Sequence, residues 1–168
     1  IVQRTYDSYT SLESQIALSY SDITHLSSSV NNEGNHFIVY YSPNSKQLFL
    51  NINNGTGWVE QIVASNVEIS TKVELLFNST GQPKIVYFDD LSEEIIILDN
   101  NQQWSSQSIS TSSSTSSGFF SSMMVNDELL IATILEDGIS SNLTLLTWNG
   151  THTESEFIAL ETDLSTNF

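Results

Sequence analysis

The chain has 168 residues, no cysteine and 39% hydrophobic residues, which is enough to bury a core in one domain or two small ones. Lys and Arg number 4 against 20 Asp and Glu, giving a formal charge of −16 at pH 7. Nucleic acids and anionic membranes bind through cations, so both are excluded as expected partners, and no apolar run is long enough for membrane insertion. The missing cysteines exclude disulfides, thiolate metal sites and cysteine nucleophiles.

Residues 1–22 are predicted to be an N-terminal extension. Within it, "SLESQIALSYS" (11–21) places apolar side chains at alternate positions, at Ile16, Leu18 and Tyr20. This alternation is typical of a β-strand, and we expect an orphan strand where the fourth strand of a preceding repeat would fall. Because the chain begins with Ile and not Met, we also expect a processed chain or a piece of a longer one.

An internal repeat of about 47 residues follows. "HFIVYYSPNSKQLFLNINNGTGW" (36–58) aligns with "PKIVYFDDLSEEIIILDNNQQW" (83–104), and this places Trp58 on Trp104 at a spacing of 46. A looser third copy covers 128–157. Recurrence at a fixed period of this length is typical of solenoids and propellers.

Each repeat holds four short segments rich in β-branched and aromatic residues, separated by turns of Asn, Gly, Ser and Asp, which predicts four strands. The first strands are predicted to end at Val30, Phe77 and Met124, each 47 residues from the last. The Ser-rich stretch 111–118 is interpreted as a connection between two repeats. The repeats are assigned to 23–65, 73–111 and 119–160, with a C-terminal tail at 161–168.

The predicted class is therefore all-β, with three four-stranded antiparallel blade-like repeats. The second strand of each repeat is apolar on both faces, which implies packing layers on both sides. Three blades cannot close a propeller ring, so we expect completion by further copies of the chain or by a missing part of a longer chain. Tandem β-sandwich domains are the alternative.

The hairpin "IVYYSPNSKQLFLNINNGTGW" (38–58) resembles the blades of sugar-binding propeller lectins, whose fucose-binding and tectonin-like members repeat a strand, a polar turn, a strand and then "GW". The resemblance covers residues 23–160 and implies a propeller fold that binds glycans. The fucose-binding family uses an Arg and a Glu with a Trp in each pocket between blades. The only Arg here is Arg4, outside every repeat, so that site does not carry over.

Three tryptophans are the candidate ligand-binding residues: Trp58, Trp104 and Trp148. An aromatic face can stack on the apolar side of a pyranose. The favoured alternative is that Trp58 and Trp104 anchor their hairpins against a neighbouring sheet, with the indole N–H bonded to a partner. Trp148 is out of register with the other two, because it ends a third strand.

Acidic residues supply a weak calcium hypothesis at Asp89, Asp90, Glu93 and Glu94, since oxygen ligands suit calcium. The run lacks the spacing of an EF-hand loop, so no cofactor is expected and solubility is the favoured explanation of the acidity. His25, His36 and His152 show no metal-ligand spacing. No catalytic motif is present, and the chain is predicted not to be an enzyme.

Four N-x-[ST] sequons occur, at Asn54, Asn78, Asn142 and Asn149. Asn54, Asn78 and Asn149 lie in predicted turns, and Asn142 lies at the start of a predicted strand. Because glycan acceptors need exposed backbone, the first three are the better candidates.

Two functions are expected to compete. The first is a secreted or cell-surface module without catalytic activity, which binds glycans or proteins in adhesion. The second is a structural subunit of an extracellular filament or coat, assembled when the orphan strand at 11–21 fills the open edge of a neighbouring subunit.

Overall fold

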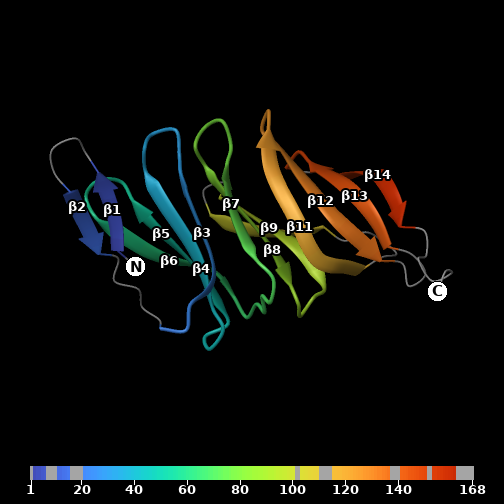
Figure 1. Cartoon of the computed structure of the whole chain (residues 1–168), viewed down its shortest axis with the longest axis horizontal. Coiled ribbons are helices and arrows are strands. Elements are labelled where there is room, and N and C mark those ends of the chain that lie inside the picture. Colours follow the sequence, from blue (N-terminus) through green and yellow to red (C-terminus); the bar gives the residue numbers. More distant parts are fainter. Residues whose placement is uncertain are drawn as a thin grey trace, which may run out of the picture.

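The computed structural model describes residues 2–6, 11–15, 21–100, 103–109, 115–136, 141–150 and 153–161. These residues form strands and turns and contain no helix. The strands make one two-stranded sheet and three four-stranded antiparallel sheets, which confirms the predicted all-β class with three blade-like repeats. Figure 1 shows the sheets side by side in a row, and not as separate two-sheet sandwiches.

The chain runs through each sheet as a simple meander. The N-terminal hairpin pairs β1 (Val2–Tyr6) with β2 (Ser11–Gln15). Sheet 1 contains β3 (Thr24–Val30), β4 (His36–Ser42), β5 (Gln47–Asn53) and β6 (Trp58–Ser65). Sheet 2 contains β7 (Val73–Phe77), β8 (Pro83–Asp89), β9 (Glu94–Asn100) and β10 (Trp104–Ile109). Sheet 3 contains β11 (Thr115–Val125), β12 (Glu128–Glu136), β13 (Ser141–Trp148) and β14 (Thr153–Glu161).

Two apolar clusters hold the row together. The cluster between sheets 1 and 2 includes Phe37, Val39, Tyr41, Leu48 and Leu50 from sheet 1, and Val73, Leu75, Ile85, Tyr87, Ile96 and Leu98 from sheet 2. The cluster between sheets 2 and 3 includes Val86, Phe88, Ile95, Ile97 and Ile109 from sheet 2, and Phe120, Leu129, Ile131, Leu146 and Trp148 from sheet 3. Sheet 2 therefore buries both faces, which explains why every residue of β8 is buried.

Polar contacts between the turns add a second link between sheets. These turns join the first and second strands, and Asn32, Ser79 and Asp127 lie at matching positions in the three of them. The Asn32 amide donates to the Ser79 carbonyl oxygen at 3.0 Å. The Ser79 backbone N–H and hydroxyl each donate to the Asp127 carboxylate at 2.6 Å. The repeat thus places one hydrogen-bonding position in register along the row.

The structure differs from the predicted elements in two places. The strand expected alone at 11–21 is shorter and paired, because Ser11–Gln15 forms a hairpin with Val2–Tyr6, while Ile16, Leu18 and Tyr20 lie outside the described residues. The Ser-rich stretch is not wholly a connection, since β11 already begins at Thr115 and pairs there with Glu136.

Candidate functional site

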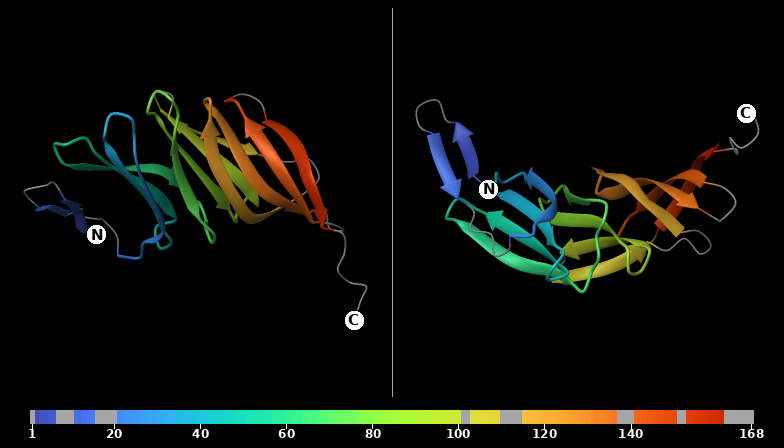
Figure 2. Two further views of the ribbon diagram at one scale, coloured as in Figure 1. Left: turned by 45° about the horizontal axis from the view of Figure 1, so that its top comes forward. Right: turned by 60° about the horizontal axis from the view of Figure 1, so that its bottom comes forward.

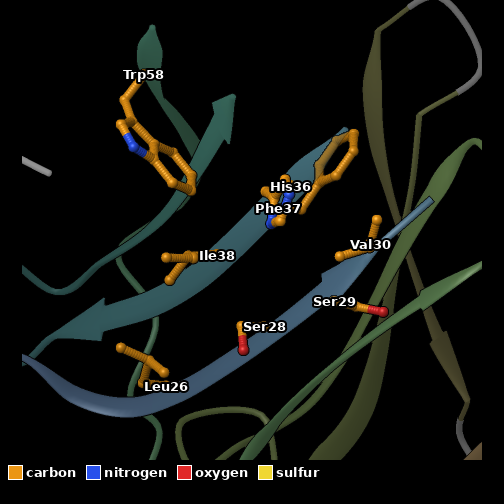
Figure 3. Close-up of a pocket in the computed structure, with 8 residues that line it drawn as sticks. All are labelled: Leu26, Ser28, Ser29, Val30, His36, Phe37, Ile38 and Trp58. Atoms are coloured by element: carbon orange, nitrogen blue, oxygen red, sulfur yellow. The ribbon is translucent and has the colours of Figure 1, made fainter. Parts of the chain in front are cut away.

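A pocket of about 350 Å³ lies on the face of sheet 1 that points away from sheet 2. It is lined by Leu26, Ser28, Ser29, Val30, His36, Phe37, Ile38 and Trp58. Figure 3 shows these residues along β3 and β4, with the Trp58 ring reaching in from β6 towards Ile38. The lining is mostly apolar, and its polar side chains on this face are Ser28 and His36. Ser29 and Phe37 lie at the alternate positions, on the side that faces sheet 2.

The sequence around the β5–β6 turn sets the position of Trp58. Gly55 and Gly57 take positive φ values of 93° and 142°, which favour glycine, and they reverse the chain so that Trp58 pairs with Asn53. Side chains alternate along a strand, so Trp58 and Glu60 share one face of β6. Glu60 accepts hydrogen bonds from the Tyr40 hydroxyl at 2.5 Å and from the Asn51 amide at 3.1 Å. These two hydrogen bonds hold the Glu60 side chain against β4 and β5 beside the pocket.

Trp104 occupies the same position in sheet 2 but meets a different environment. Its ring is partly buried and packs against the core between sheets 1 and 2. In both Trp58 and Trp104 the indole nitrogen is buried and has no hydrogen-bond partner among the described residues. The expected partner of these two N–H groups is therefore missing here, and an unpaired buried donor costs about 1–3 kcal/mol.

Trp148 ends β13, as predicted, and is buried between sheets 2 and 3 with 3% of its surface exposed. Its indole N–H donates to the Gln107 side-chain oxygen at 2.8 Å. The Lys84 ammonium lies 4.8 Å from the centre of its ring and pairs with Asp99 at 2.8 Å. The Trp148 ring is thus enclosed by sheet 2 and does not line the pocket of sheet 1.

Two of the four acidic residues considered for calcium, Asp89 and Asp90, bond to the segment that joins sheets 1 and 2. Asp89 accepts from the Glu68 backbone N–H at 2.9 Å and from the Ser92 hydroxyl at 3.1 Å. Asp90 accepts from the Ser70 hydroxyl at 2.9 Å. Nowhere in the described ranges do three His, Asp or Glu side chains come together in a group that could hold a metal ion.

Two of the three histidines lie in the described residues, on β3 and β4. His36 begins β4 and lines the pocket. His25 lies in β3 with a φ of 49°, and its ring is stacked at 6.4 Å from that of Tyr41. His152 is outside the described residues.

Three of the four sequons lie in turns, as the sequence predicts. Asn54 is exposed in the β5–β6 turn, Asn78 follows β7, and Asn149 is exposed just after β13. The Asn54 and Asn78 side-chain oxygens accept bonds from the hydroxyls of Thr56 and Thr80 at 2.7 and 2.8 Å. Asn142 lies within β13, paired with Leu135 and Leu160.

Sequence reasoning identified Trp58 but not the surface beneath it. Leu26, Ser28 and Val30 lie on the exposed side of β3, and Ile38 lies on the same face of β4. The repeat does indicate that these four positions belong to one face of a sheet, because at a spacing of 47 they correspond to Val73, Leu75, Phe77 and Ile85. The exposure of Leu26 and Val30 in sheet 1, 46% and 50%, was not predictable, since it depends on which sheet packs in front.

No helix in the part of the chain that the structure describes is long and apolar enough to cross a membrane.

Comparison with family models finds no match, and no curated protein matches the chain. Among solved structures, the chain is similar to a fucose lectin from Kordia zhangzhouensis in complex with methyl-fucoside, with 15% sequence identity and a TM-score of 0.51. The similarity covers 78% of this chain and 96% of that chain. At this identity the likeness concerns the fold, and it agrees with the row of blade-like sheets.

Proposed function

We propose that the chain is a non-catalytic glycan-binding module built from propeller-type blades, which works in a secreted or cell-surface setting in adhesion. The observation that supports it most is the partly exposed Trp58 ring at the edge of an apolar pocket that also offers the Ser28 hydroxyl and the His36 imidazole. Aromatic rings pack on the C–H face of a sugar, and a few polar groups then fix its orientation.

Charge narrows the class of glycan. No Lys, Arg, Asp or Glu lines the pocket, and the chain carries a net charge of −16. Sialylated or sulfated glycans would be repelled by the overall field and would find no cation in the pocket. The expected ligands are therefore neutral sugars, and a pocket of about 350 Å³ suits one or two sugar rings. The similar fucose lectin makes methyl-fucoside the first probe to test.

Binding is tested by calorimetric titration with methyl-fucoside and a set of other neutral methyl glycosides. Trp58→Ala is expected to weaken binding at least tenfold, because it removes the stacking surface. Val59→Ala is the matched control, since Val59 is the next residue, is 65% exposed and points to the other face of β6. Binding that is unchanged in Trp58→Ala, or absent for every neutral glycoside in the wild type, would contradict the proposal.

Assembly with further copies or with more blades of a longer chain is also proposed. It is supported by exposed apolar residues on the face of sheet 3 that points away from sheet 2, namely Met123, Val125 and Leu143. Large exposed apolar patches favour contact with another protein surface. Native mass measurement of the wild type and Met123→Ser tests this point, since the substitution should reduce any assembly through this face.

A further inference from the structure

The N-terminal hairpin repeats the third and fourth strands of sheet 1, β5 and β6. Moving β5 and β6 back by 47 residues places them on β1 and β2, and every described pair of the hairpin then matches. Val2 pairs with Gln15 as Phe49 pairs with Ile62. Tyr6 pairs with Ser11 as Asn53 pairs with Trp58, and the three pairs between these also agree. The hairpin therefore has the register of the third and fourth strands of a repeat.

The described residues do not include a first and a second strand for the sheet to which β1 and β2 belong. In sheets 1 to 3 the third strand lies between the second and fourth strands, whereas β1 pairs only with β2 among the described residues. The hairpin stands beside sheet 1, on the side away from sheet 2, as both views in Figure 2 show. It thus occupies the end of the row where a sheet in front of sheet 1 would stand.

The pocket face of sheet 1 corresponds, position by position, to a face that is buried elsewhere in the row. The residues 47 positions after Leu26, Ser28 and Ile38 are Val73, Leu75 and Ile85. Those three residues are 4%, 5% and 0% exposed, because sheet 1 packs against them. Leu26, which no such sheet covers among the described residues, is 46% exposed, whereas Ile38 is 8% exposed.

The side chains that cover the equivalent face in sheet 2 are also known. Phe37, Val39 and Tyr41 lie at alternate positions of β4 and pack in the same cluster as Val73, Leu75 and Ile85. A second strand with aromatic and β-branched residues at alternate positions is therefore the surface that fits such a face.

We propose that the pocket face of sheet 1 is the docking site of a β-hairpin with the first- and second-strand pattern of this repeat. The hairpin pairs through its second strand with the open edge of β1 and completes a fourth four-stranded sheet. Main-chain hydrogen bonds along β1 give it its register, and alternate apolar side chains fill the space over Leu26, Ser28 and Ile38.

This inference does not depend on glycan binding. Trp104 keeps a partly exposed ring although sheet 1 is packed against sheet 2. Trp58 holds the equivalent position, so its ring stays at the rim when the hairpin is in place. The hairpin covers the Ser28 hydroxyl on the floor of the pocket, so a docked hairpin and a sugar seated in the pocket exclude each other, and only the Trp58 ring stays accessible.

The chain itself supplies a suitable probe. A copy of residues 24–47 placed directly before Ile1 contains a first strand, a second strand and the turn into a third strand, at the spacing that the repeat requires. The matched control carries Phe37→Ser and Val39→Ser in the copied segment only. Both proteins keep residues 1–168 intact, so neither relies on a truncated chain.

The extended chain is expected to unfold at a higher urea concentration than the wild type and to slow amide exchange at least tenfold at Ser28 and Ile38. The control should keep wild-type exchange at both positions. Unchanged exchange at Ser28 and Ile38 in the extended chain would overturn the proposal. A wild type that is already oligomeric, and that becomes monomeric with Leu26→Ser, would also overturn it, because a second copy would then be the occupant.

Discussion

Trp58 and Trp104 lie 46 residues apart, each at the first residue of the fourth strand of its sheet, and they point in the same direction along the row. Trp104 packs against the core between sheets 1 and 2, whereas Trp58 borders the open pocket. One position of the repeat therefore has a packing role in one sheet and an accessible ring in another.

This contrast predicts different stability effects. Trp104→Ala empties a site in the core between two sheets, and we expect a loss of unfolding free energy near the lower end of about 3–5 kcal/mol, because the ring is not fully buried. Trp58→Ala should cost less, since the pocket leaves one side of the ring without packing partners. Urea denaturation of both variants measures the difference, and equal losses would contradict the assigned environments.

The ion pair between Lys84 of β8 and Asp99 of β9, both in sheet 2, predicts a further effect. Lys84 and Asp99 have side chains that are only 8% and 15% exposed. Lys84→Ala leaves Asp99 as an uncompensated buried carboxylate, and such a change costs about 3–5 kcal/mol. The double variant Lys84→Met with Asp99→Leu removes both charges and should recover most of this loss. A double variant as unstable as Lys84→Ala would show that the pair matters by its shape and not by its charge.

The turn contact between sheets 2 and 3 predicts a dependence on pH. Hydrogen bonds from the Ser79 hydroxyl and backbone N–H hold the pKa of Asp127 below its ordinary value. The folded state thus binds the proton less tightly than the unfolded state, so this contact stabilises the fold above about pH 4 and is lost as the pH falls through the lowered pKa. Wild type and Asp127→Asn should differ in urea midpoint at pH 7 and converge at about pH 2.

Asn32→Ala provides the control for this titration, because it removes the neighbouring contact to Ser79 without removing a charge. Its difference from the wild type should remain the same over that pH range. A pH-independent difference for Asp127→Asn would contradict the charge-assisted contact.

Glycosylation is predicted by position. Asn54 and Asn149 are exposed in turns and Asn78 follows a strand end, so these three can reach a glycosylating enzyme, whereas Asn142 is held within a sheet. Expression through a glycosylating secretory pathway should therefore give a mass above that of the polypeptide, and Asn→Gln at each of the three positions should remove one glycan. A mass equal to the bare polypeptide would contradict this prediction and would weaken the cell-surface proposal.

Much of the fold could be predicted because the repeat is visible in the sequence. The predicted ends of the first strands at Val30 and Phe77 are the observed ends of β3 and β7, and Met124 lies one residue before the end of β11. β-Branched and aromatic runs between polar turns allow little other than short strands at these places.

The N-terminal hairpin was harder to predict, since Val2–Tyr6 has no apolar pattern that stands out and is recognisable only by its spacing from β5. The candidate site was only partly predictable for a different reason. The tryptophans could be found in the sequence, but whether a ring is covered depends on the neighbouring sheet. Trp148 was grouped with Trp58 by residue type, and packing between sheets 2 and 3 separates the two.

Indole signals in a ¹H–¹⁵N correlation spectrum test glycan binding at Trp58 most directly. The chain has three tryptophans, and single Trp→Phe variants assign their three indole signals. On titration with a neutral glycoside that binds, the Trp58 signal should shift in a saturable way, while the signal of the enclosed Trp148 should stay in place. A bound glycoside that leaves the Trp58 signal unmoved, or that shifts only Trp148, would contradict a sugar site at the pocket of sheet 1.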